Sequence, residues 1–464
     1  MKKIYLLLVA AILFTTVKAN NIILANVLLN GQNTVSQFSL VNFDVSWENS
    51  WRTITNEANY DGAWLFMKFR KKSSNTWQHA TIDAGGATMP SGSVIQTSLD
   101  GKGVWIYHTL PAADFTGNVN YTGAKMRWDY GVDGVLNTDS VEIRLFAVEM
   151  VYIPSGKYAL GSGGTEINHF NEATVTTSYN VLSESAIIVG TSAGNLSYPV
   201  TAASGDGGGP IPAGFPKGFQ AFWIMKYESS QQQYADFLNN LDFIKATNRN
   251  PGIFTGTHPN LTPAIPERAM TSLSIYDHAA FSDWAALRPY TELEYEKVSR
   301  GFNQVPTPNE YPWGNTTITA TTTVSSPGTT FETASNGNAN WGNALGTALR
   351  CGIYATTTSN RQQSGSGFYG VMEMAGNVYE TVITVGNPAG RAFTGANGDG
   401  NLDVNGDGNT ANWPVNGTGY GLRGGGYQDV ATSLRTSDRS SGSYTGVYTT
   451  RVGTFGSRCA RTAE

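Results

Sequence analysis

The stretch Gly367–Glu380 reads GFYGVMEMAGNVYE, and the rest of the chain is best interpreted outward from it. The aromatic residues between glycines at its start are typical of a strand that turns tightly. At its end, Asn377 and Glu380 lie three residues apart, directly after Gly376. Amide, carboxylate and backbone carbonyl oxygens are the ligands that Ca²⁺ prefers. The stretch therefore predicts either a calcium site or a buried turn in which both side chains satisfy local backbone donors.

The N-terminus has the three parts of a secretory signal peptide. Met1–Lys3 is a short positive head, Ile4–Phe14 is apolar, and Val17–Ala19 offers the small residues that a signal peptidase reads. We therefore expect residues 1–19 to be a signal peptide and the mature chain to be secreted or periplasmic. No cysteine follows the apolar run, which disfavours a lipid anchor. No later apolar run is long enough to span a bilayer.

The composition favours β structure and long ordered loops. The 464 residues include 53 glycines and 11% aromatic residues, and Leu-rich helical runs are scarce. The net charge of −5 comes without a basic cluster, so nucleic-acid binding is not expected. The five histidines form no H-x-H or H-x-x-x-H pair, so a His-based zinc or iron site has no local signature.

Short alternating runs fill the first part of the chain and predict a β-sandwich accessory domain over residues 20–149. In Val41–Trp47 the odd positions are expected to face the core. The tryptophans of this domain are interpreted as core aromatics rather than as a carbohydrate platform. The segment Ser46–Arg52 is the expected exposed exception. The predicted strands are Ile22–Leu29, Gln37–Trp47, Ala63–Arg70, Gly103–Thr109, Lys125–Tyr130 and Val141–Val148.

Residues 150–464 are predicted to form a second domain with both strands and helices. Ser229 or Ser230 can cap a helix, and Thr291 followed by Glu294 is a capping box at the start of another. The predicted elements are a strand, turn and strand over Met150–Ser162, a strand over Phe222–Glu228, and helices over Gln231–Leu241 and Ile275–Trp284.

Six motifs in this second part occur in an order that resembles the formylglycine-generating enzyme, or sulfatase-modifying factor, superfamily. They are the strand from Met150, Tyr311–Asn315 (YPWGN), Gly367–Glu380, Leu422–Tyr427, Arg435–Arg439 and Gly456–Ala460. The resemblance runs from Met150 to the C-terminus. It implies an α+β, loop-rich fold of the C-type-lectin-like kind for residues 150–464, preceded here by the all-β domain.

The resemblance also implies a calcium ion at the opening stretch. The oxygens implied for it belong to Ala375, Gly376, Asn377, Val378 and Glu380. A second family site would use Asn340 and Trp341, but its partner aspartate has no clear counterpart around Gly346–Gly352. Calcium is therefore the expected cofactor at the first site, and the second ion is less well supported.

The sequence departs from the family at the active site. The enzymes use two cysteines, five residues apart after RGGS, to bind copper and oxidise a substrate cysteine. Those positions fall here on about Asp429 and Leu434, neither of which can be a thiolate ligand. Formylglycine synthesis, copper and iron are therefore not expected. Polar candidates in the same pocket are Asp429, Arg435, Asp438, Arg439 and Arg458, of which Arg435, Asp438 and Arg439 are interpreted as an internal ion-pair network.

The two cysteines, Cys351 and Cys459, leave two alternatives: one disulfide bridge or two buried free thiols. The resemblance implies that Cys459 is structural and that its usual partner position is Ser282 here. Cys351 is then the hypothetical replacement partner.

A glycine-rich insertion carries a second calcium signature. Asp403, Asn405 and Asp407 at alternate positions, followed by Gly408, match the first half of an EF-hand-like loop. The twelfth position is Pro414 instead of the closing glutamate. A plain hairpin with Asn-Gly and Asp-Gly turns is the alternative.

Three functions are consistent with these observations. The first is an exported, non-catalytic, calcium-stabilised module that binds a protein, glycan or cell-envelope ligand. The second is an oxidoreductase of the same superfamily with altered metal chemistry. The third is a structural surface-assembly protein, or a lectin-like protein in which Tyr427–Thr454 forms a variable ligand face.

Overall fold

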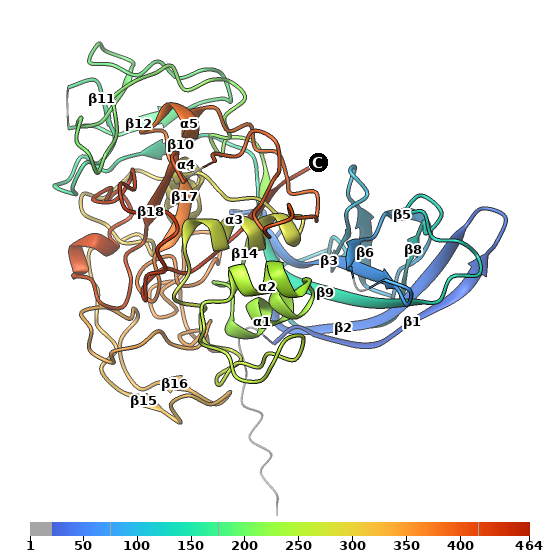
Figure 1. The fold of residues 1–464 in the computed structure, drawn as a ribbon. Helices are drawn as coiled ribbons and strands as arrows, with labels where there is room; N and C mark the ends of the chain where they lie inside the picture. The colour runs from blue at the N-terminus through green and yellow to red at the C-terminus, as the bar shows by residue number, and fades with distance from the viewer. Residues whose placement is uncertain (1–20, 75, 175, 416) are drawn as a thin grey trace, which may run out of the picture.

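The structure, a computed structural model, describes residues 21–464 except residues 75, 175 and 416. The predicted signal peptide, residues 1–19, lies outside the described residues. A strand-rich part and a loop-rich part lie side by side (Figure 1), at the right and left of the view respectively. The described residues are mostly β structure and loop, with five α-helices. In this part of the chain, no helix has the length and hydropathy needed to cross a membrane.

The strand-rich part is built from antiparallel pairs that belong to one curled sheet. β2 pairs with β1 and β8, while β3 pairs with β7 and β9, and the two halves meet at the Arg52–Tyr60 pair. The strands are β1 (Ile23–Asn33), β2 (Phe38–Arg52), β3 (Tyr60–Lys71), β4 (Gln78–His79), β5 (Ile82–Thr88), β6 (Ser93–Thr97), β7 (Val104–His108), β8 (Phe115–Trp128) and β9 (Val141–Ile153). All six predicted strands are present, and β4, β5 and β6 were missed.

Side chains from both halves of the curled sheet form a shared apolar core. Val41, Phe43, Val45 and Trp47 are each at most 1% exposed, which confirms the predicted alternation along β2. The tryptophans at positions 47, 64, 105 and 128 are buried, as expected for core aromatics. The predicted exposure of Ser46–Arg52 was wrong, because Trp51 packs against the edge of the second part, with Lys226 Nζ 4.9 Å from its ring centroid.

β9 carries the sheet from the first part of the chain into the second. It pairs with β3 from Val141 to Tyr152, and its last residues also pair with β14 (Phe222–Met225), which pairs with β19 (Ala460–Thr462). The result is a continuous 11-stranded sheet. The boundary predicted between residues 149 and 150 therefore lies inside a strand, and the two parts share backbone hydrogen bonds.

The loop-rich part adds short strand pairs and small helices. The pairs are β10 (Tyr158–Leu160) with β12 (Tyr179–Val181), β11 (Asn171–Glu172) with β13 (Leu196–Ser197), β15 (Val324–Ser325) with β16 (Thr333–Ala334), and β17 (Glu380–Ile383) with β18 (Tyr420–Arg423). The helices are α1 (Gln231–Asn239), α2 (Phe243–Arg249), α3 (Ile275–Trp284), α4 (Glu292–Arg300), α5 (Pro388–Arg391) and the 3-10 turn η1 (Ala431–Leu434).

Local capping signals set where these helices begin. Ser230, Ser274 and Thr291 each accept a hydrogen bond from the third helical residue, whose own side chain bonds back to the cap. α3 has the predicted bounds, and the predicted caps at Ser230 and Thr291 are confirmed. α2 was missed because its first two residues, Phe243 and Ile244, are both exposed and give no amphipathic pattern.

Candidate functional site

Gly367–Glu380 forms a chain of buried turns. The strand predicted at its start is absent, and β17 begins only at Glu380. Gly370, Glu373, Gly376 and Asn377 all have positive φ, which bends the backbone at each of these positions. For Glu373, with φ of 49°, this conformation is uncommon in a residue that has a side chain.

The two predicted side-chain ligands of calcium are engaged by protein donors. The Asn377 Oδ1 atom accepts hydrogen bonds from the Leu349 amide at 2.7 Å and from Asn340 Nδ2 at 3.1 Å. The Glu380 carboxylate accepts one from Arg458 Nε at 2.7 Å and another from the Tyr290 hydroxyl. Each of the two Glu380 carboxylate oxygens therefore already has one protein partner.

Two buried acids that sequence reasoning missed lie in the same region. Glu228, next to the cap of α1, accepts hydrogen bonds from Asn377 Nδ2 and from the Val378 amide. Glu373 is 3% exposed, and neither of its carboxylate oxygens has a hydrogen-bond partner of ordinary geometry. Glu373 could have been found from its place inside the glycine-rich stretch, whereas no local signal links Glu228 to it.

The pKa values of the three acids that form an acidic cluster here, Glu228, Glu373 and Glu380, are all raised, mainly by burial. Burial raises the pKa of Glu373 to about 7, although the nearby Gly352 amide lowers it. Burial, then the charge of Glu373, raise the pKa of Glu228 well above its usual value. Burial also raises the pKa of Glu380, against the effect of Arg458. Burial therefore keeps these carboxyls in their neutral, protonated form to a higher pH than usual.

The predicted second site is joined to the first. Asn340 donates to Asn377 Oδ1, and its carbonyl accepts from the Asn377 amide at 2.9 Å. The Asn340 Oδ1 atom is buried without a hydrogen-bond partner. Trp341, next in sequence, is partly buried beside Tyr311 and Trp313. The structure therefore brings Asn340, Asn377 and Glu228 into one hydrogen-bonded group.

The two positions onto which the resemblance maps catalytic cysteines, Asp429 and Leu434, have structural roles here. Asp429 is half-buried, and its carboxylate accepts hydrogen bonds from the Gly426 amide at 2.9 Å and from the Tyr379 hydroxyl at 3.1 Å. Leu434 is 0% exposed and packs in an apolar cluster with Tyr311 and Trp313. Asp429 therefore stabilises a turn, and Leu434 packs in an apolar core.

The other polar candidates do not converge on one pocket. Arg435 donates to Asn309 Oδ1 at 2.8 Å, and Asp438 accepts from Ser440 Oγ at 2.6 Å. Arg458 pairs with Glu380. The ion-pair network predicted among Arg435, Asp438 and Arg439 was wrong, because none of the salt bridges found in residues 21–464 joins these three.

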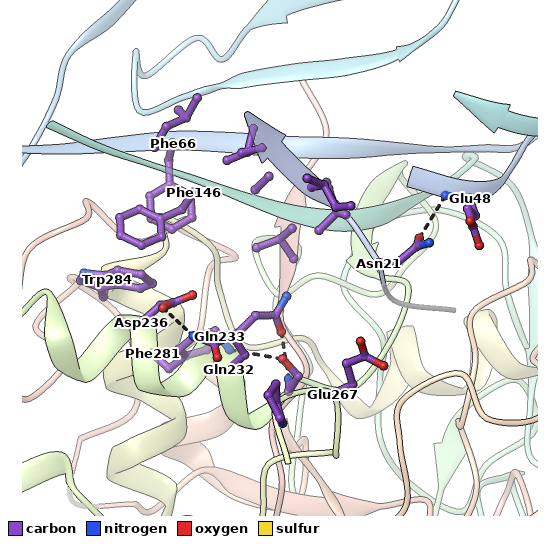
Figure 2. A pocket seen from close by; sticks show the side chains of 18 residues that line it. Asn21, Glu48, Phe66, Phe146, Gln232, Gln233, Asp236, Glu267, Phe281 and Trp284 are labelled. Atoms are coloured by element: carbon purple, nitrogen blue, oxygen red, sulfur yellow. Dashed lines mark hydrogen bonds between the residues drawn. The ribbon is translucent and has the colours of Figure 1, made fainter. Parts of the chain in front are cut away.

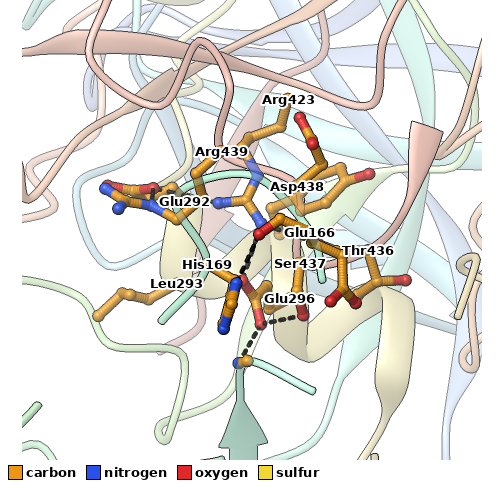
Figure 3. A network of polar contacts seen from close by, with 12 residues as sticks. Glu166, His169, Glu292, Leu293, Glu296, Arg423, Thr436, Ser437, Asp438 and Arg439 are labelled. Atoms are coloured by element: carbon orange, nitrogen blue, oxygen red, sulfur yellow. Dashed lines mark hydrogen bonds and ion pairs between the residues drawn. The ribbon is translucent and has the colours of Figure 1, made fainter. Parts of the chain in front are cut away.

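Arg439 instead belongs to a buried network centred on helix α4 (Figure 3). Its Nε atom lies 2.7 Å from Glu292 Oε2, and Arg423 contacts both Glu292 at 3.1 Å and Glu296 at 2.8 Å. Arg300 Nη1 lies 3.0 Å from the second Glu296 oxygen. Every side chain of this α4 network is at most 1% exposed. The four-residue spacing of Glu292 and Glu296 places them on one face of α4, and this pattern could have been found in the sequence. No local pattern links these glutamates to their distant arginine partners.

The Asp403–Asp407 loop folds back on itself. Asp403 Oδ1 accepts the amides of Asn405 and Asp407, each at 2.8 Å, and Leu402 bridges to Gly408. Asp407 also lies 3.1 Å from Arg249 Nη2. This geometry is compatible with both predicted alternatives, so calcium binding here stays a prediction. Over the described residues as a whole, no three His, Cys, Asp or Glu side chains are grouped so that they could hold a metal ion.

Of the two alternatives for the cysteines, the structure has the free thiols. Cys351 and Cys459 are both unbridged and 0% exposed. The Cys351 thiol donates to the Glu228 carbonyl, and Cys459 Sγ lies 3.2 Å from Ser282 Oγ, at the position that the resemblance implied. Burial raises the pKa of Cys459 to about 11 and raises that of Cys351 well above its usual value.

The fold and this site define a mostly β, loop-rich protein whose turns are held by buried polar networks. Comparison with protein families finds a sulfatase-modifying factor enzyme 1-like domain over residues 142–463. The chain therefore belongs to the FGE-sulfatase family, as the motif order predicted. A comparison with curated proteins gives no match.

Proposed function

We propose that this protein is an exported, non-catalytic member of its family that serves as a calcium-stabilised binding module at the cell envelope or surface. The observation that carries the proposal is the pair Asp429 and Leu434 at the family's catalytic cysteine positions. The copper chemistry implied by the family needs soft thiolate ligands, whereas Leu434 offers none and is buried in an apolar cluster. We also propose a C-type-lectin-like arrangement for residues 150–464 and a β-sandwich for residues 20–149.

The two cysteines support the same conclusion. Each is fully buried, and burial raises both thiol pKa values. At neutral pH these groups are therefore thiols rather than the thiolates that bind metals or attack substrates. Neither lies at the positions that follow Arg423–Gly426.

The decisive experiment is an oxidation assay with a cysteine-containing peptide. The purified chain is supplied with copper(I) and oxygen, and peptide masses are followed beside an active family member as positive control. We expect no conversion above the copper-only background, because the chain lacks the thiolate pair. Stoichiometric copper in the purified protein together with peptide conversion would establish the alternative, an oxidoreductase of the family.

Calcium binding is supported by buried oxygens in and beside the acidic cluster. Both Glu373 oxygens are buried with the Gly352 amide as their nearby backbone donor, and Asn340 Oδ1 is buried without a hydrogen-bond partner. Oxygens of these kinds suit Ca²⁺. The predicted ligands Asn377 and Glu380 already accept hydrogen bonds from protein donors. We therefore propose Glu373 as the carboxylate that binds the ion.

Replacing Glu373 with glutamine tests this assignment. The folded-state pKa of Glu373 is raised from 4.5 to about 7, so its contribution to stability is present below pH 4.5 and is lost as the pH rises through 7. Without calcium at about pH 8, the Glu373→Gln variant is expected to be more stable than wild type. Its free energy of unfolding should be higher by about 1–3 kcal/mol. Chemical unfolding followed by tryptophan fluorescence measures the difference.

Added calcium should reverse this order. Wild type is expected to gain stability with Ca²⁺ and the Glu373→Gln variant to gain little, because the variant has lost its carboxylate. Glu57→Gln, at a partly exposed site, is the matched control and should respond as wild type does. Equal calcium effects on wild type and Glu373→Gln would count against a cation at Glu373.

A further inference from the structure

A cavity of about 540 Å³, the Trp51 cavity, lies where the curled sheet meets the loop-rich part. Residues 49–59, from the end of β2 and the connection to β3, form one wall, and residues from the loop 355–372 form the other. Asn59 Nδ2 donates a hydrogen bond to the Tyr369 carbonyl at 2.8 Å and so joins the two walls. Small-molecule sites often occur where two parts of a protein meet, and their volumes include this one. Asp429 and Leu434 do not line the cavity.

Aromatic rings form one side of the Trp51 cavity. Trp51 and Phe368 both line it and are only half-buried, so part of each ring stays exposed. The Trp51 indole is held in place, with Lys226 Nζ 4.9 Å from its ring centroid. A Cβ atom at Gly370 would lie 2.9 Å from Trp51 Cζ2, so only glycine lets the backbone pass this close to the ring. The rings therefore offer a fixed, flat surface for the C–H groups of a ligand.

Short hydroxyl side chains lie beside these rings. Thr356, which is exposed, and Ser359 both line the cavity. Thr356 Oγ1 accepts the amides of Ser359 at 3.0 Å and Thr358 at 3.4 Å. Ser359 Oγ donates to the Thr356 carbonyl at 3.2 Å and accepts the Thr356 amide at 2.9 Å. Since a hydroxyl has one donor and two acceptor positions, Thr356 can still donate to a ligand and Ser359 can still accept from one.

The charges that line the Trp51 cavity are compensated within the protein. Among the described lining residues, the charged ones are Glu57, Lys226 and Arg361. Lys226 Nζ lies 2.9 Å from Asp61 and 3.1 Å from Glu149. Arg361 Nη2 donates to two backbone carbonyls, and its charge is also stabilised by Glu57. A neutral ligand therefore suits this surface, because a charged one would be desolvated without a new partner.

A second cavity, of about 620 Å³, lies between the curled sheet and helices α1 and α3 (Figure 2). Its acidic side chains, Glu48, Asp236 and Glu267, have partners within the protein. Asp236, for example, accepts a hydrogen bond from Gln232 Nε2 at 2.9 Å, and the charge of Arg144 also acts on it. The polar groups of this second cavity are therefore used within the protein, and they indicate no class of ligand.

We propose that the Trp51 cavity binds a neutral oligosaccharide. A sugar ring combines a flat C–H face with several hydroxyls that both donate and accept hydrogen bonds. The C–H face stacks on Trp51, and the hydroxyls bond to Thr356 and Ser359. This inference rests on the proposed function as a binding module and names the ligand class. An acidic oligosaccharide is disfavoured, because Lys226 already has two carboxylate partners.

The test compares three neutral tetrasaccharides, cellotetraose, mannotetraose and N-acetylchitotetraose, with the acidic tetragalacturonate. Binding to the full chain is measured by calorimetry at neutral pH. We expect saturable one-site binding of a neutral sugar with a Kd below about 5 mM, and binding of tetragalacturonate at least about tenfold weaker. No saturable binding of any neutral sugar in that range, or tightest binding of tetragalacturonate, would refute the proposal. Peptide oxidation in the copper assay would instead overturn the proposed function and leave sugar binding measurable.

Two variants assign the binding to this cavity. Trp51→Ala removes the stacking surface and is expected to weaken the affinity for the neutral sugar about tenfold. Its control is Trp77→Ala, at a partly buried tryptophan outside the cavity, which should bind as wild type does.

Thr356→Val tests hydrogen bonding at an exposed position, where packing is little disturbed, and is expected to weaken the affinity about fivefold. Thr316→Val, at an exposed threonine outside the cavity, is its control. Thermal unfolding verifies that the variants are folded. Wild-type affinity in folded Trp51→Ala or in Thr356→Val would overturn this placement of the sugar.

Discussion

Replacing Arg439 with methionine is expected to lower the free energy of unfolding by about 3–5 kcal/mol. Arg439 contacts both oxygens of Glu292, through Nε at 2.7 Å and Nη2 at 3.0 Å, and both side chains are 0% exposed. Methionine keeps apolar contact with the Phe170 ring, over which the guanidinium lies at 4.0 Å. The loss is therefore mainly electrostatic, because Glu292 is left with Arg423 as its remaining cation.

Urea unfolding isolates that effect with four variants: Arg439→Met, Arg70→Met, Glu292→Gln and the double variant of Arg439→Met with Glu292→Gln. Arg70→Met breaks a partly exposed ion pair with Glu142 and is expected to cost less than 1 kcal/mol. Combining Arg439→Met with Glu292→Gln removes the unbalanced charge, so the double variant should be less destabilised than the sum of its single changes. A strictly additive double variant would show that Arg439 acts through packing alone.

Replacing Arg458 with methionine is expected to have a comparable effect, and one that depends on pH. Arg458 is 0% exposed and contacts Glu380, as well as the carbonyls of Met225 and Met372 at 2.9 Å and 2.7 Å. Without it the acidic cluster keeps no arginine at its centre. We expect a loss of about 3–5 kcal/mol at about pH 8.

Acidification should make this loss smaller. The folded-state pKa values of all three glutamates are raised, so they take up protons in the folded protein before they do so in the unfolded chain. Neutral acids need no arginine, and the difference between wild type and Arg458→Met should shrink by about half or more at about pH 5. A difference that stays constant between the two pH values would argue against an electrostatic role for Arg458.

Local patterns predicted much of the fold. The alternation of Val41–Trp47 fixed the core face of β2, and the capping residues Ser230 and Thr291 gave the starts of α1 and α4. These signals act within a few residues, so they can be read without knowing the rest of the chain. The missed helix α2 begins with two exposed apolar residues and is tied to the distant Leu402 and Asn405 carbonyls by Lys245 and Asn248. The wrongly exposed Trp51 packs against a distant segment.

The candidate site was predicted less completely. The motif order identified the family. The assignment of Asp429 and Leu434 to its catalytic cysteine positions stays a prediction. The expected ligands Asn377 and Glu380 are engaged by Leu349, Arg458 and Tyr290, none of which is near them in sequence. The buried acids Glu373 and Glu228 were not predicted.

The sequence by itself determined the family and the main strands and helices. Only the tertiary structure decided which buried charges pair and that the cysteines are free thiols. The physical reason is the sequence separation over which each kind of interaction acts. Propensity and capping act between neighbours, whereas Glu292 meets Arg439 across 147 residues and Glu228 meets Asn377 across 149. The opening stretch is therefore recognisable from its residues, but its chemistry is set by the distant side chains packed around it.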